Sequence, residues 1–171
     1  MVRGCRFSPG GSWHAYHPVV SSIAVRLAEL GLVLPPPMPP AGNYLACNRL
    51  GSTLYVGGHG PVDGTRMMCG KVGRDLTLAE GVVAARMTAL SILATLDAQP
   101  GGLDAIARIV KVFGMVNVAP GFNQTPAVID GCSNLLVDVF GEAGRHTRTA
   151  VGLAELPFDI AVEIELVAEL R

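Results

Sequence analysis

The sequence predicts one α+β domain in which a mixed sheet carries its helices on one face. Residues 77–98 begin with Thr77 and Glu80 at the spacing of a capping box and continue with apolar residues at helical spacing. Residues 107–119 and 160–170 instead alternate over much of their length and are rich in β-branched residues, which is typical of strands. A chain of 171 residues is expected to form one such domain.

Shorter elements precede and follow the long helix. We expect a first helix that Gly31 ends and a hairpin that turns at Gly51, because glycine readily adopts the left-handed backbone of helix ends and turns. The remaining expectations are a helix at Ser22–Leu30, strands Tyr44–Asn48 and Thr53–Val56 within Asn43–Pro61, an irregular loop Val62–Gly73, a helix Gln124–Phe140, a turn Gly141–Arg145, and strands Thr147–Ala154 and Ile160–Leu170. The short connection Leu156–Asp159 predicts that the last two strands are antiparallel neighbours.

Residues 1–20 read as an irregular N-terminal extension, and residues 21–171 as the folded domain. The extension is rich in Gly, Pro and Ser and has no apolar segment of the secretory kind. His14 and His17 lie three residues apart, which would suit a metal on a helix, but the neighbouring Pro and Gly residues argue against a helix there. We therefore expect no metal site in this extension.

The composition of the chain favours some classes of function and argues against others. Half of the residues are hydrophobic and 16% are charged, which supports a packed core and favours an association surface. A net charge of −1 and 5% aromatic residues provide no basic, aromatic track for RNA. No apolar run reaches the ~20 residues of a membrane span. The four cysteines Cys5, Cys47, Cys69 and Cys132 lack metal-ligand spacing, and reduced thiols fit a cytoplasmic protein.

Two segments near the C-terminus carry side chains suited to chemistry. Period two places Glu163 and Glu165 on one face of the last strand, where they meet solvent, another subunit, or a cleft in which a glutamate activates water. Upstream, His146 and Arg148 share a strand face. An arginine fork binds a carboxylate in a bidentate manner, so Arg148 is a candidate anion-binding residue.

The stretch from Arg148 to Glu165, RTAVGLAELPFDIAVEIE, resembles the signature of the RidA/YjgF family: an Arg, a short strand, Leu-Pro, then a strand with Val-Glu-Ile-Glu. NYL at Asn43–Leu45 and VGGHGP at Val56–Pro61 look like its ligand-facing hairpin. GKVGRDLT at Gly70–Thr77 and VFGEAGRH at Val139–His146 resemble its longer "endoribonuclease L-PSP/chorismate mutase-like" subgroup.

The resemblance implies a chorismate-mutase-like fold and a homotrimer with clefts between subunits. Archetypal members hydrolyse reactive enamines and imines, such as 2-aminoacrylate, to 2-keto acids and ammonia without a metal or organic cofactor. In this sequence the matching catalytic positions are Arg148, which would hold the substrate carboxylate, and Glu163, which would place the attacking water. We expect the two side chains to share one sheet face. We also expect the Arg148 guanidinium to have no partner of its own and therefore to recruit an anion. Tyr44, Gly57, Gly58, His59 and Ala150 match the substrate-binding positions.

Departures from the archetype leave alternatives open. Ala150 stands where the archetype has cysteine, Gly57 where it has serine, and His59 where glutamine is common. His59 could carry protons near neutral pH or be a plain turn residue, and His146 has the same ambiguity. The first hypothesis is an imine deaminase; the second is a non-catalytic trimer that binds or senses small carboxylates. An endoribonuclease is disfavoured by the charge balance.

Overall fold

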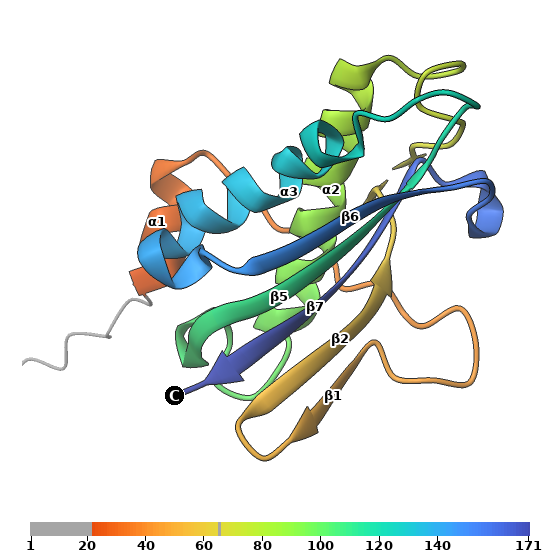
Figure 1. Cartoon of the computed structure of the whole chain (residues 1–171). Helices are drawn as coiled ribbons and strands as arrows, with labels where there is room; N and C mark the ends of the chain where they lie inside the picture. Colours follow the sequence, from red (N-terminus) through yellow and green to blue (C-terminus); the bar gives the residue numbers. More distant parts are fainter. Residues whose placement is uncertain (1–21, 65) are drawn as a thin grey trace, which may run out of the picture.

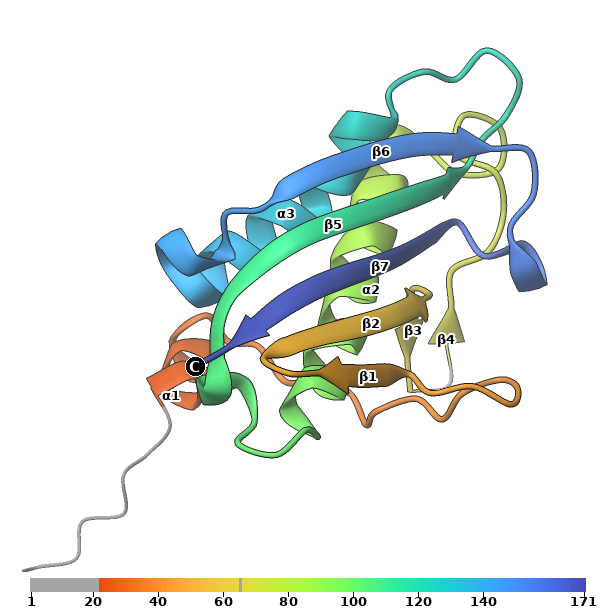
Figure 2. The same cartoon turned by 60° about the horizontal axis from the view of Figure 1, so that its bottom comes forward.

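The computed structural model describes residues 22–64 and 66–171, so the predicted extension, with His14, His17 and Cys5, lies outside the described residues. Within that range, one sheet has helices on one face and is open on the other, as predicted (Figures 1 and 2). Its strands follow the order β1-β2-β7-β5-β6. They are β1 Cys47–Leu50, β2 Thr53–His59, β5 Ile106–Asn117, β6 Thr147–Leu153 and β7 Val162–Leu170.

The helices form where the sequence predicts them. They are α1 Ser22–Glu29, α2 Leu78–Asp97 and α3 Thr125–Phe140, with short 3-10 turns η1 Leu103–Ala105, η2 Gly141–Gly144 and η3 Pro157–Asp159. The capping box is present in full, since the Thr77 side chain accepts from the Glu80 backbone and the Glu80 carboxylate accepts from the Thr77 backbone. Gly31 ends α1 with φ +64°, the left-handed value that favours glycine.

The core lies between the sheet and helices α2 and α3. Gly131 of α3 allows the closest approach between these helices, because a Cβ there would collide with the Val82 carbonyl of α2. By length and composition α2 could cross a membrane, but here it is a core helix buried over much of its length. Its buried surface is therefore explained by packing inside the domain. The largest fully buried side chains include Leu54, Ile92, Leu93, Leu96, Ile109, Ile129, Leu135, Leu136 and Ile164.

The prediction that the last two strands are neighbours is wrong. Strand β5 lies between them, paired in parallel with β6 and antiparallel with β7. Burial explains the arrangement: every second residue of β7 from Val162 to Ala168 is fully buried, whereas β6 exposes most of its residues. The more apolar strand therefore takes the centre of the sheet and the more polar strand takes the edge.

Three boundaries also differ from the expectations. Strand β1 begins at Cys47 instead of Tyr44, and β2 continues through the glycines to His59, with a bulge between Val56 and His59. The expected loop Val62–Gly73 contains a small second sheet of β3 Val62–Asp63 and β4 Arg66–Met67. Glycine is rare inside strands because it leaves a gap in the packing, so the sequence favoured a turn at a segment that is paired.

Candidate functional site

A largely apolar pocket of about 310 Å³ brings four of the predicted site residues together. Its walls come from the proline-rich connection before β1, the end of β2, the β3–β4 hairpin and the connection that leads into β7. The predicted residues in the lining are Tyr44, Gly58, His59 and Glu163. The rest of the lining is Met38, Pro39, Pro40, Ala41, Ala46, Gly60, Val62, Met67, Pro157, Phe158 and Ile160.

The Glu163 carboxylate is the acidic group of this pocket. It lies directly over Gly58, where a Cβ would collide with its Oε1, so any larger residue at this position would displace the carboxylate. Burial, and secondarily the charge of Glu165, raise the pKa of Glu163 above its ordinary value. Among the described residues, none donates a hydrogen bond to this carboxylate or forms an ion pair with it. Glu163 is therefore a half-buried carboxylate that is free to accept a proton or a ligand donor.

Tyr44 lies on the connection before β1, where its hydroxyl accepts a hydrogen bond from the Ala41 backbone at 3.1 Å. About half of the side chain stays exposed, so the ring forms part of the pocket rim. Tyr44 thus holds the proline-rich connection and presents an aromatic face to whatever enters the pocket.

His59 connects strand β2 to helix α2. Its Nδ1 lies 2.8 Å from the Gly57 carbonyl, and its Nε2 lies 2.8 Å from the Thr95 hydroxyl of α2. The residue is 4% exposed, and burial lowers the pKa of the imidazole. Because the carbonyl can only accept, Nδ1 carries the proton and Nε2 accepts from Thr95. Both nitrogens are occupied within the chain, which favours a structural role over proton transfer.

Gly57 does not line this pocket. Its N–H donates to the Ala46 carbonyl at 3.0 Å, its carbonyl holds His59, and it borders a separate hollow of about 290 Å³ on the open sheet face. That hollow lies over the strands and is lined by Leu45, Asn48, Tyr55, Val56, Gly57, Lys111, Phe113, Glu165, Leu166 and Val167. Gly57 therefore borders the hollow on the open sheet face, whereas the adjacent Gly58 borders the Glu163 pocket.

Arg148 and Glu163 lie on opposite faces of the sheet, which corrects the prediction that they share one. Arg148 is level with Val112 of β5, whose side chain is buried under the helices, whereas Glu163 is level with Met115. Residues an odd number of positions apart on a strand point to opposite faces. Consistent with this, Arg148 Nη1 donates to Asp130 of α3 at 2.7 Å.

Arg148 also has a partner within the chain, contrary to the premise that its guanidinium would be vacant. Its ion pair with Asp130 leaves 25% of the Arg148 side chain and 52% of the Asp130 side chain exposed. The same Nη1 donates to Ser133 Oγ at 3.0 Å. Neither α3 residue stood out in the sequence, because helix α3 carried no motif.

Ala150 follows Arg148 on the helix-facing side of β6. It is level with Gly114 of the neighbouring strand β5, where a Cβ would collide with Ile129 of α3, so β5 lies close to the helix at this level. The Ala150 carbonyl accepts from the Thr125 hydroxyl at 3.2 Å. Its methyl group therefore packs in a tight space on the side of the sheet away from Glu163.

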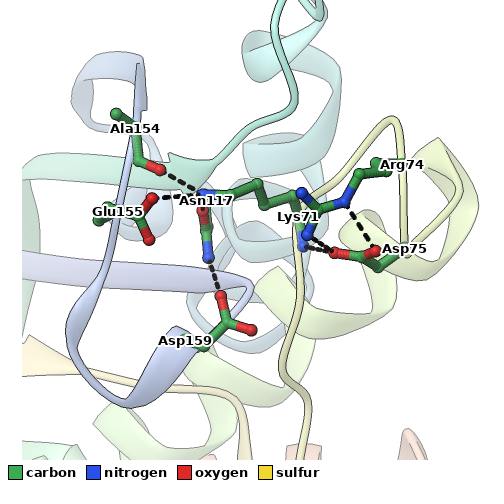
Figure 3. A network of polar contacts seen from close by, with 7 residues as sticks. All are labelled: Lys71, Arg74, Asp75, Asn117, Ala154, Glu155 and Asp159. Atoms are coloured by element: carbon green, nitrogen blue, oxygen red, sulfur yellow. Dashed lines mark hydrogen bonds and ion pairs between the residues drawn. The ribbon is translucent and has the colours of Figure 1, made fainter.

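A polar network that the sequence did not reveal positions one wall of the pocket (Figure 3). The Lys71 ammonium donates to Asn117 Oδ1 at 2.8 Å and to the Ala154 carbonyl, and pairs with Glu155 at 3.3 Å. The amide of Asn117, which is fully buried, donates to Asp159 at 2.8 Å. These bonds anchor both ends of the connection between β6 and β7.

The anchored connection holds Phe158 in an unusual backbone conformation. Phe158 and Asp159 have φ of 57° and 55°, in the left-handed region that costs a bulky residue of order 1 kcal/mol or more. Phe158 is 73% exposed and belongs to the pocket lining. The Lys71 network thus keeps an aromatic side chain at the pocket wall.

Metal-ligating groups do not gather among residues 22–64 and 66–171, since no cluster of three His, Cys, Asp or Glu side chains is found there. The described cysteines Cys47, Cys69 and Cys132 are unbridged. Burial raises the pKa of Cys132 to about 12, which leaves it an unreactive thiol in the core.

Comparison with known proteins agrees with this fold. The family described as "YjgF/chorismate_mutase-like, putative endoribonuclease" matches residues 24–170. Protein TCP17 of Trypanosoma cruzi is 42% identical over 151 residues, which cover 87% of this chain and 94% of that protein.

Two solved structures extend the likeness. A protein of Shewanella oneidensis, named as a "putative endoribonuclease", is 35% identical with a TM-score of 0.83, covering 86% of this chain and 99% of that one. TdcF of E. coli, solved with bound serine, shares the fold at 23% identity and a TM-score of 0.55, over 81% and 94% of the two chains. The match of the family across the sheet, the helices and the pocket leads to one conclusion: the chain belongs to the YjgF/chorismate-mutase-like family.

Proposed function

We propose that this protein hydrolyses reactive enamines and imines of small carboxylates to 2-keto acids and ammonia. The single observation that carries the proposal is Glu163, a half-buried carboxylate with no partner among the described residues and a raised pKa, in a mainly apolar pocket. Such a group is suited to take a proton from water. The apolar walls suit the hydrocarbon part of a small ligand.

The proposed site requires two copies of the chain. Glu163 and Arg148 point to opposite faces of one sheet, so a cleft that contains both takes Glu163 from one copy and Arg148 from another. Family membership supports a homotrimer that forms such clefts. The high apolar content of the chain supports the same assembly. We place this enzyme in the cytoplasm, in line with the unbridged cysteines of the described residues.

The reaction in this cleft needs binding, one base and water. Arg148 Nη1 is held by Asp130 and Ser133, and its other N–H groups are directed to the substrate carboxylate. The Glu163 carboxylate accepts a proton as the water oxygen bonds to the imine carbon, and the C=N electron pair moves to the protonated nitrogen. Return of this proton to nitrogen makes ammonia the leaving group. As the C–N bond breaks, the hydroxyl proton passes to the Glu163 carboxylate, and the C–OH bond becomes the carbonyl of the keto acid.

A non-catalytic carboxylate-binding trimer is the second candidate. One observation favours it: Ala150 and Gly57 bring no polar side chain to the cleft. An endoribonuclease, which the family description names, gains no support from a net charge of −1. We therefore rank it below both other candidates.

An assay that generates 2-aminoacrylate and short-chain imines in situ, and follows keto-acid formation, tests the proposal. Wild-type protein should accelerate the reaction, and Glu163→Gln should lower kcat/KM by ~10²–10⁴, the usual contribution of a general base. Glu165→Gln is the matched control, since this more exposed glutamate lies two residues further along the same strand face. Wild-type rates equal to the uncatalysed rate would leave the binding protein as the better account.

A further inference from the structure

Four polar side chains gather where helix α3 lies under the edge strand β6. Asp130 and Ser133 are three residues apart on α3, and both contact Arg148 at the start of β6. His146, just before β6, contacts Ser133. This cluster lies on the sheet face opposite Glu163. The proposed imine chemistry uses Ser133 only to hold Arg148 and gives no role to His146.

The hydrogen bonds of His146 fix which nitrogen carries its proton. Nδ1 lies 2.7 Å from the Gly144 carbonyl, which can only accept, so Nδ1 is the protonated nitrogen. Nε2 lies 3.1 Å from Ser133 Oγ and is therefore the unprotonated nitrogen of the neutral ring. The Ser133 hydroxyl must then donate its proton to Nε2. A carbonyl thus orients the imidazole, and the imidazole accepts from a serine.

Arg148 adds a positive charge next to the Ser133 hydroxyl. Its Nη1 donates to Ser133 Oγ at 3.0 Å. The Ser133 oxygen therefore accepts from a cation, while its own proton points to the imidazole base. Burial first, and then the charge of Arg148, lower the pKa of His146 and keep the ring neutral near pH 7. Ser133 and His146 are both half-buried, and Arg148 keeps a quarter of its side chain exposed, so a small molecule can approach.

We propose that Ser133 and His146 form a nucleophile–base pair that hydrolyses small carboxylate-bearing esters through an acyl–serine intermediate, with Arg148 holding the ester's carboxylate. This activity goes beyond the proposed imine hydrolysis, because it uses a different nucleophile and breaks a different bond, although Arg148 holds the carboxylate of the substrate in both.

The steps balance with water as the only co-reactant. Ser133 Oγ bonds to the ester carbonyl carbon while its proton passes to His146 Nε2. The carbon–oxygen bond to the alcohol then breaks, and the alcohol leaves with that proton. Water, losing a proton to Nε2, attacks the acyl–serine carbon, and Ser133 leaves with the proton restored. The positive charge of Arg148 beside Oγ favours the developing negative charge on that oxygen.

A fluorophosphonate probe tests the pair on the full-length protein, because it reacts only with an activated serine. In that reaction an Oγ–P bond forms, fluoride leaves and the proton moves to His146. Intact-mass and peptide mass spectrometry should locate one adduct at Ser133, lost in Ser133→Ala. His146→Gln should slow labelling by ~100-fold or more, the usual contribution of a general base. Ser52→Ala, which removes an exposed serine elsewhere, should label like wild type.

A second measurement covers the case in which Ser133→Ala does not fold. Wild-type protein should hydrolyse the mono-p-nitrophenyl ester of succinate faster than p-nitrophenyl butyrate, and Arg148→Lys should reduce that preference by ~10-fold or more, as expected when a bidentate contact is lost. The proposal is overturned if wild-type protein takes up no probe, if the adduct lies elsewhere, or if His146→Gln labels at the wild-type rate.

Discussion

The Glu163 pocket and the Arg148 cluster are complementary halves on opposite faces of one sheet. Glu163 is a carboxylate in a mainly apolar pocket whose described lining contains no Lys or Arg, whereas Arg148 is a cation held by a carboxylate and a serine. The Glu163 pocket lacks the kind of cation that the Arg148 cluster has, and the Asp130 carboxylate of that cluster is already paired with Arg148. The difference teaches that residues of one short family signature can face two different surfaces of a sheet. The proposed site requires a second copy of the chain to bring these surfaces together.

The largest expected effect concerns ligand binding by the Arg148 cluster. Arg148→Lys keeps the positive charge but loses the planar fork, so it should weaken 2-ketobutyrate binding by ~1–3 kcal/mol, about 5- to 150-fold. Isothermal titration of wild type and variant measures this. The matched control is Arg145→Lys, since Arg145 pairs with the exposed Glu142 away from the cluster. Equal affinities in wild type and Arg148→Lys would remove Arg148 from the proposed site.

The next prediction tests whether His59 has a structural role or a catalytic role. His59→Leu removes both hydrogen bonds of a buried ring and leaves the Gly57 carbonyl and the Thr95 hydroxyl without it. We expect a loss of ~1–3 kcal/mol in the free energy of unfolding at pH 7.5, measured by urea denaturation. A lost imine activity with unchanged stability would instead assign His59 a chemical role.

The pH dependence of the same variant has a defined sign. The pKa of His59 is lowered in the folded state, so below about pH 6.5, the ordinary histidine value, the unfolded chain binds more protons than the folded one. Acidification from pH 7.5 to 5 should therefore destabilise wild type. His59→Leu should lose part of this slope and retain the part due to His146, whose pKa is lowered as well. An unchanged slope in His59→Leu would contradict the assignment.

The smallest expected effect concerns the strained wall of the Glu163 pocket. Phe158→Gly should raise the free energy of unfolding by ~0.5–1 kcal/mol, because glycine adopts φ of 57° without strain. Removal of the ring should at the same time weaken ligand binding in the pocket. Val33→Gly is the control, since Val33 is also exposed but does not have positive φ, and it should give no gain in stability. Thermal denaturation of the two variants distinguishes them.

Local sequence patterns predicted the helices and strands, but they did not predict which strands lie next to each other in the sheet. The Thr77–Glu80 capping box and the alternation of β7 each depend on residues close in sequence, and both were confirmed. The position of β5 between β6 and β7 depends on which strand buries more apolar surface in the assembled domain. That comparison is not visible in the short connection between the two strands.

The site could be predicted only in part for a similar reason. Tyr44, Gly58 and Glu163 line one pocket, and their roles in binding stay predictions. Lys71 and Asn117 carry no local signal, because a loop lysine and a strand-end asparagine are ordinary until the fold brings them together. Phe158 has a left-handed backbone although it is not glycine, so its residue type does not predict the strain.

Subunit mixing tests most directly whether Arg148 and Glu163 act from different copies. Arg148→Ala and Glu163→Gln proteins are each prepared, confirmed inactive in the imine assay, and reassembled together at equal concentrations. Our account predicts recovered activity, because about a quarter of the clefts in a randomly mixed trimer then combine an intact Arg148 with an intact Glu163. Mixed assemblies, verified by native mass spectrometry, that stay as inactive as the separate variants would contradict it.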